Sequence, residues 1–218
     1  RTKTPLISQP ILRSTCGSYN KTNCTKSGAL IKMTRHPVKS LYVFDIDDTL
    51  FRTSARARVV NIKGQVKYLS SEELKDYELT ACEKICFDEF RDAKKFVEES
   101  QPIESMIKIA QDCIQKTAEG SKTILLTARA DLDCKTKFLE YLNSSGLDTN
   151  NIYVERAGNL PNLKTSLAKK LIISNYLKSE QFKKAYLFDD SLENILSFVE
   201  LSSWFSKINF YPILILKT

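Results

Sequence analysis

Short apolar runs alternate along the chain with segments in which apolar residues recur at helical spacing. Residues 41–44 read Leu-Tyr-Val-Phe, and runs of similar length lie at 123–126, 152–154 and 185–188. Such runs are typical of strands buried on both faces of a parallel sheet. The helical spacing is found in four segments, 103–114, 138–142, 168–172 and 195–199. The alternation predicts an α/β protein with a doubly wound, Rossmann-like parallel sheet.

Particular residues mark the ends and the buried faces of these helices. Thr165 or Ser166 is expected to cap the third helix, and Gly146 to end the second, because these residue types favour such positions. The apolar stripes of the helices are expected to form core. Among them are Leu171, Leu196 and Val199.

The stretch between Asp45 and Thr127 is longer than one crossover helix needs. An insertion directly after a strand that carries candidate site residues lies over that site. We therefore expect a small cap over about residues 52–102. The alternative is an insertion without a function, since surface loops lengthen at little cost.

Within this insertion, residues 57–69 predict a hairpin. Its strands, 59–62 and 65–68, flank a Lys63-Gly64 turn. Two charged helical stretches follow, one from Ser71 and one over residues 87–99.

The first strand ends abruptly in three carboxylates, those of Asp45, Asp47 and Asp48. Acids at the exit of a buried strand repel one another and lose hydration, so their ionised forms are costly. A divalent cation would offset this cost, and Mg²⁺ prefers hard oxygen ligands. The carboxyl ends of strands in open α/β sheets are also where ligands bind. The alternative is a solvated acidic loop.

Other predicted strands end in residues that suit phosphoryl transfer. Asp45 can attack phosphorus, and Asp47 can protonate the leaving oxygen and then activate water. Thr127, at the end of the second strand, offers a hydroxyl to phosphoryl oxygens. Asp190, with Asp189 behind it, offers a carboxylate to Mg²⁺ at the fourth. A lysine is also needed to neutralise the phosphoryl group.

These residues resemble the motifs of the haloacid dehalogenase-like (HAD) phosphohydrolases. Asp45-Ile46-Asp47-Asp48-Thr49 matches the DxDxT first motif, Leu126-Thr127-Ala128-Arg129 the second, and Asp189-Asp190 with Glu193 the acidic fourth. The stretch from Phe44 to about Val199 is most similar to small phage-encoded, RNA-repair-like members. The closer similarity is carried by Phe51-Arg52-Thr53, Thr127-Ala128-Arg129-Ala130, Arg156-Ala157-Gly158-Asn159-Leu160 and Asp189-Asp190-Ser191 with Asn194.

The resemblance implies a Mg²⁺-dependent reaction in which Asp45 is both nucleophile and metal ligand. Asp47 would be the general acid/base and would bind the metal through its backbone carbonyl. Asp190 would be a side-chain metal ligand, with Asp189 in support.

The third-motif lysine implied by the family is Lys169, which lies 20 residues before Asp189. Lys164 and Lys170 remain alternatives. Arg129 would either touch substrate or pair with an acid.

The basic charge is confined to the N-terminal segment. The chain has a net charge of +7, but residues 1–44 hold eight cations and no acid. The remainder is near neutral, which weakens bulk charge as an argument for nucleic-acid binding by the main domain. We therefore divide the chain into a basic arm, 1–39, and a HAD-like hydrolase domain, 40–218.

Three interpretations of the arm stay open. It could be a disordered segment that contacts RNA or DNA phosphates. It could belong to an organelle-targeting sequence. It could also be non-native over residues 1–32, because Met33 begins a compact start before the first strand and Arg1 is an unusual first residue.

Cysteine usage and hydropathy exclude other classes. The six cysteines form no CxxC pair, and His36 is the one histidine of the sequence, so a structural zinc site is not expected. No apolar run approaches membrane-spanning length. We expect reduced thiols and a cytoplasmic protein (of a host cell if phage-encoded), or a mitochondrial one if the arm is a targeting sequence.

The sequence thus predicts a Mg²⁺-dependent phosphatase that hydrolyses a phosphomonoester through an aspartyl-phosphate. The expected partner is a small phosphorylated substrate or a nucleic-acid end, with no membrane. Transfer to an alcohol instead of water is a further possibility. The alternative is an inactive HAD scaffold that binds partners through its basic arm.

Overall fold

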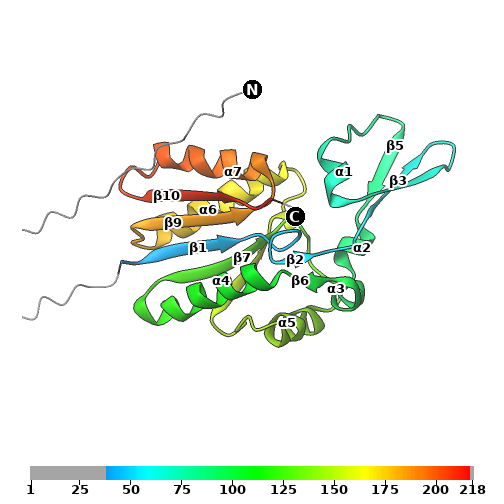
Figure 1. Cartoon of the computed structure of the whole chain (residues 1–218). Coiled ribbons are helices and arrows are strands. Elements are labelled where there is room, and N and C mark those ends of the chain that lie inside the picture. The colour runs from blue at the N-terminus through cyan, green and yellow to red at the C-terminus, as the bar shows by residue number, and fades with distance from the viewer. Residues whose placement is uncertain (1–37, 217–218) are drawn as a thin grey trace, which may run out of the picture. The chain divides into compact units, whose positions relative to one another are not determined.

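A computed structural model describes residues 38–216, so the predicted basic arm lies almost wholly outside the described residues. The described chain is an α/β structure whose central sheet has five parallel strands in the order β10-β9-β1-β7-β8 (Figure 1). These strands are β1 (Ser40–Phe44), β7 (Lys122–Thr127), β8 (Ile152–Arg156), β9 (Lys184–Asp189) and β10 (Asn209–Leu214).

The four predicted strands are confirmed, and β10 adds a fifth at the edge of the sheet. Pro212 lies within β10 and faces Leu187 of β9. Proline has no N–H to donate, and an edge strand tolerates this loss because only one of its sides pairs with another strand.

Helices cover both faces of the sheet because successive strand residues point to opposite sides. Tyr42 and Phe44 pack with α4 (Glu104–Gln115) and α5 (Lys135–Ser144) in one core. Leu41 and Val43 pack with α6 (Thr165–Ser179) and α7 (Leu192–Val199) in the other. Three short 3₁₀ helices join these elements: η1 (Lys116–Glu119), η2 (Ala157–Asn159) and η3 (Glu200–Ser203).

The predicted N-cap of the third helix needs correction. The N-cap of α6 is Lys164, without a side-chain capping bond, so neither Thr165 nor Ser166 fills that position. The Ser166 hydroxyl instead donates to Glu193 at the start of α7. By contrast, α5 ends before Gly146, whose φ of 91° only glycine adopts readily, as predicted.

Three residues of the predicted apolar stripes are exposed and do not belong to the core: Leu171, Leu196 and Val199. The inner face of α6 mixes apolar and polar side chains, so apolar spacing alone does not identify it. Its buried members are Ser166, Ala168, Lys169, Ile173, Ser174 and Leu177.

Residues 53–100, here called the insertion, lie between two short strands that pair antiparallel, β2 (Phe51–Arg52) and β6 (Gln101–Pro102). The predicted hairpin is confirmed as β3 (Ala57–Asn61) and β4 (Val66–Leu69). A further strand, β5 (Glu83–Cys86), pairs with β3 in a small sheet (Figure 1).

The helical stretches of the insertion are shorter than the charge pattern suggests. One is α1 (Ser71–Lys75), and residues 87–99 divide into α2 (Asp88–Arg91) and α3 (Ala93–Glu99). The division falls at Asp92, whose carboxylate caps α3 by accepting from the Lys95 N–H. None of the helices within residues 38–216 is long and apolar enough to cross a membrane.

Candidate active site

The site begins where β1, β7 and β9 end side by side at the same edge of the sheet. Asp45 follows β1, and its N–H donates to Phe188 of β9 at 2.9 Å, which continues the strand pairing. Thr127 and Asp189 are the last residues of β7 and β9. All three are buried. Parallel pairing thus gathers residues that are far apart in sequence at one edge.

Lys169 reaches this edge from α6. Its Nζ lies 2.5 Å from Asp45 Oδ1 and 2.8 Å from Asp189 Oδ2, and the residue is only 2 % exposed. Burial by itself would lower the pKa of Lys169, but the carboxylates of Asp189 and Asp45 outweigh it and raise that pKa above its usual value. The lysine therefore stays charged between two carboxylates.

The two alternative lysines point elsewhere. Lys164 pairs with Glu193 at 2.8 Å, and Lys170 with Glu200 at 2.6 Å. Of the three, the structure brings Lys169 to Asp45. Glu193, counted with the acidic motif in the sequence, is half-exposed and bound to α6.

Asp45, Asp189 and Asp190 form a group that could hold a metal ion. One carboxylate oxygen of each lies within 4.8 Å of the others. Burial is the main cause that raises the pKa of Asp45 well above its usual value; Lys169 lowers it, and the charges of Asp189, Asp47 and Asp190 raise it again. A divalent cation would relieve that unfavourable charge, and three carboxylates are a donor set that suits Mg²⁺.

Asp189 is fixed by bonds from three directions. Its oxygens accept from Lys169, from the Ser191 N–H at 2.9 Å, and from Asn194 Nδ2 at 2.9 and 3.1 Å. Ser191 also caps α7, which sets the position of Asn194 one turn into the helix. Sequence reasoning included Asn194 only in the family resemblance and gave it no role.

The Asp47 carboxylate has hydrogen-bond partners of its own. Arg129 donates to it through Nε at 2.9 and 3.2 Å and through a terminal nitrogen at 2.6 Å. Thr53 adds a hydrogen bond of 2.8 Å. Burial would raise the pKa of Asp47, but the charge and hydrogen bonds of Arg129, together with Thr53, bring it below its usual value.

The Thr127 hydroxyl lies within the same network. It accepts from the Arg129 N–H at 3.0 Å and donates to Asp47 at 3.4 Å. It therefore shapes the turn that follows β7 and adds one bond to the carboxylate.

Asp48 adopts φ = 59°, a left-handed conformation that aspartate tolerates better than most residues. This turns the chain back so that the Leu50 and Phe51 N–H groups both donate to the Ile46 carbonyl. The Asp48 carboxylate accepts from Ser71 of α1 at 2.7 Å. The sequence assigns no step of the reaction to Asp48, and the structure gives it a part in shaping the loop after β1.

Gly158 packs closely against the backbone of the turn after β7. A Cβ atom there would lie 2.4 Å from the Ala128 carbonyl oxygen and 2.5 Å from the Ala130 nitrogen. No side chain fits at those distances. The sequence shows a glycine at this position but gives no sign that the turn lies against it.

The chain matches no protein-family model, and no curated protein matches it. The geometry of the described residues is therefore what bears on function.

Proposed function

We propose that the protein is a HAD-type, Mg²⁺-dependent phosphatase that hydrolyses a phosphomonoester with Asp45 as nucleophile. The observation that carries the proposal is the pairing of Lys169 with both Asp45 and Asp189 at the carboxyl ends of adjacent strands. A buried lysine there keeps Asp45 oriented and offers positive charge for an incoming phosphate. The separate bonding of Asp47 supports a second, distinct role for that carboxylate.

The reaction would proceed in two steps. Asp47 is ionised beside Arg129 in the free protein, so it would first take up a proton as the substrate binds. In the first step, an Asp45 oxygen attacks phosphorus, the bond to the leaving oxygen breaks, and the Asp47 carboxyl gives that oxygen its proton. In the second, the Asp47 carboxylate takes a proton from water, the water oxygen attacks phosphorus, and the bond to Asp45 breaks. Phosphate leaves, and both aspartates return to their starting states.

The metal would be held by Asp45 and Asp190, supported by Asp189, with the Asp47 backbone carbonyl as the further ligand that the resemblance implies. Asp45, Asp47, Asp189, Asp190, Lys169 and Arg129 together carry a net formal charge of −2 when ionised. A divalent cation matches that charge. When bound, Mg²⁺ would shield Asp45 from the phosphate and stabilise charge on the phosphoryl oxygens.

The insertion would act as a cap over this site. Thr53, directly after β2 and four residues before β3, bonds to Asp47, and Ser71, two residues after β4, bonds to Asp48. Both ends of the β3–β4 hairpin are thus joined to the loop that carries the proposed nucleophile. A segment attached in this way is suited to closing over a bound substrate.

The charge of residues 49–71, which include the hairpin, favours an extended anionic substrate, such as a nucleotide or the phosphorylated end of a polynucleotide. No acid occurs between Asp48 and Glu72. That stretch holds five cations: Arg52, Arg56, Arg58, Lys63 and Lys67. A basic segment joined to the site loop would attract phosphates beyond the one that is cleaved.

Asp45→Asn tests the proposal, with Asp112→Asn on the exposed side of α4 as the matched control. Phosphate release from nucleoside monophosphates and phosphorylated oligonucleotides is measured with Mg²⁺ and with a chelator. We expect Asp45→Asn to lose on the order of 1,000-fold or more while staying folded, and the control to keep its activity. With p-nitrophenyl phosphate, whose leaving group needs little protonation, Asp47→Asn should accumulate a phosphoryl adduct on Asp45, seen by mass spectrometry after acid quenching.

Substantial activity in Asp45→Asn would contradict the mechanism. A wild-type protein that releases no phosphate with any of these substrates would favour the inactive scaffold instead.

A further inference from the structure

The Arg129 guanidinium joins three parts of the chain. It holds both oxygens of Asp47, after β1, and its other terminal nitrogen donates to the Phe90 carbonyl of α2 at 2.8 Å. The guanidinium carbon lies 5.2 Å from the centre of the Phe90 ring and 4.9 Å from that of Phe96 on α3. Planar, forked donors make arginine suited to such two-sided contacts, whereas lysine offers one point charge.

Arg129 has little freedom to move or to reach substrate. Its side chain is 1 % exposed. The turn that carries it is held by the hydrogen bond from the Arg129 N–H to the Thr127 hydroxyl and by close packing against Gly158. A guanidinium buried this completely acts through the groups it already contacts. Its effect on the reaction would therefore pass through Asp47.

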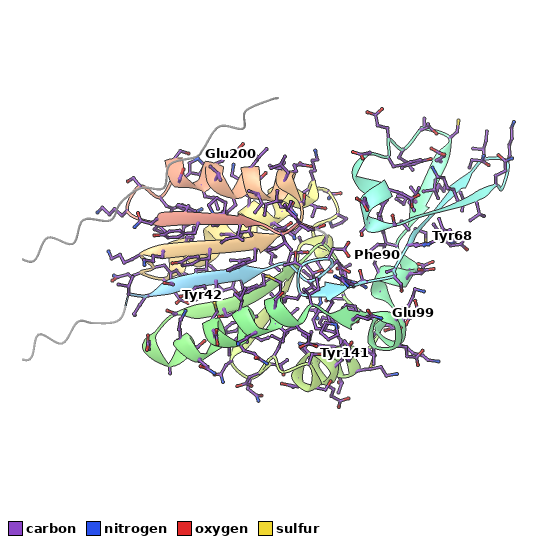
Figure 2. All side chains as sticks on the ribbon, in the orientation of Figure 1. Tyr42, Tyr68, Phe90, Glu99, Tyr141 and Glu200 are labelled. Atoms are coloured by element: carbon purple, nitrogen blue, oxygen red, sulfur yellow. The ribbon has the colours of Figure 1, made fainter. Side chains whose placement is uncertain are left out.

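The α2–α3 junction is also bound to Asp133, in the segment that follows this turn. The Asp133 N–H donates to the Arg91 carbonyl, and the Asp133 carboxylate accepts from the Ala93 N–H, both at 2.9 Å. Figure 2 shows Phe90 on α2, where the insertion adjoins the strand ends. A displacement of this junction would therefore displace the atoms that fix Arg129.

From this geometry, and resting on the proposed function, we propose that Arg129 is a positioning residue that orients the Asp47 carboxylate and couples it to the α2–α3 junction of the insertion. When the junction is in place, Asp47 is aimed at the leaving oxygen. When the junction moves, the orientation is lost. The insertion would thus control proton transfer without supplying a group that touches the substrate.

Leaving-group dependence tests the first half of the proposal. Arg129→Lys is compared with wild type, with Lys122→Arg as the control, since Lys122 is a largely buried cation paired with Glu180 at the opposite end of β7. Because an alkoxide needs a proton to leave, we expect kcat for an alkyl phosphate to fall about 10- to 100-fold, with KM changed less than about 3-fold. The burst of p-nitrophenolate from p-nitrophenyl phosphate should persist, because that leaving group needs little protonation.

The second half is tested by Phe96→Leu, alone and combined with Arg129→Lys. We expect Phe96→Leu to lower alkyl phosphate turnover about 3- to 10-fold in the wild-type background and to add little in the Arg129→Lys background. Additive losses would overturn the coupling. A merely structural role would instead lower the burst, the alkyl turnover and the unfolding temperature together.

A rise in KM with kcat unchanged in Arg129→Lys would show substrate anchoring and overturn the inference, as would kinetics equal to those of wild type. A wild-type protein without phosphatase activity would overturn the proposed function as well. The two failures are therefore distinguishable.

Discussion

Two carboxylates of one short motif have opposite surroundings. Asp45 lies on what we call the lysine side, made of Asp45, Lys169, Asp189 and Asp190. Asp47 lies on the arginine side, made of Asp47, Arg129, Thr53 and Thr127. Burial dominates on the lysine side and raises the pKa of Asp45, whereas Arg129 outweighs burial on the other side and lowers the pKa of Asp47.

The difference lies in how the cations are shared. Lys169 divides its charge between two carboxylates, and a third is close by. Arg129 gives its charge to one carboxylate. On the lysine side the pKa of Asp45 stays raised, which a bound metal ion would oppose, whereas on the arginine side Arg129 matches the charge of Asp47. One side is suited to binding a metal and phosphate, and the other to holding a single proton-transfer group in place.

Removing the lysine should have the largest effect. Lys169→Met leaves buried carboxylates without their shared cation, and breaking a buried pair in this way costs about 3–5 kcal/mol. We expect urea unfolding to show a loss of that size, reduced by added Mg²⁺. Lys170→Met is the control and should cost under about 1 kcal/mol, since its partner Glu200 is exposed. Equal stability of the two variants would remove the distinction between the sides.

A smaller effect is expected on the arginine side from Gly158→Ala. The added methyl meets backbone atoms of residues 128–130, so the turn must shift, at a cost of about 1–3 kcal/mol. The shift should displace Arg129 and lower turnover. Gly120→Ala is the control, because its φ of 84° makes alanine strained by a comparable amount of about 1–2 kcal/mol far from any motif residue. If both variants lose stability and neither loses turnover, the turn does not set the position of Arg129.

The lysine side was largely predictable from the sequence. Strand ends in a parallel sheet converge, so Asp45 and Asp189, together with Thr127 of the arginine side, could be brought together from apolar runs alone. Lys169 was harder, because a spacing argument does not choose among three neighbouring lysines. Lys169 is the lysine on the buried face of α6. Because that face carries both polar and apolar side chains, apolar spacing identifies neither Lys169 as buried nor Leu171 as exposed.

The arginine side was not predictable in the same way. Its contacts join Arg129 to Phe90 and Asp47 to Thr53, across sequence separations that no strand pairing determines. They depend on where a helix of four residues, α2, lies against a loop. A charge pattern that reads as one helix over residues 87–99 gives no sign of the break at Asp92 that permits this packing. Packing of irregular segments follows from the whole fold, so local pattern carries little information about it.

The smallest effects are expected from removing single hydrogen bonds, which should change Mg²⁺ affinity on the lysine side and turnover on the arginine side. Asn194→Ala removes bonds that fix Asp189, one of the carboxylates proposed to bind or support Mg²⁺. We expect Mg²⁺ affinity to fall about 10-fold.

Thr53→Val removes a bond to Asp47 and should leave Mg²⁺ affinity unchanged. It should lower turnover about 3- to 10-fold, since one such bond is worth about 0.5–1.5 kcal/mol. Calorimetric titration with Mg²⁺ and steady-state kinetics measure the two quantities separately. If Thr53→Val weakened Mg²⁺ binding as much as Asn194→Ala does, the lysine side and the arginine side would not act separately within the site.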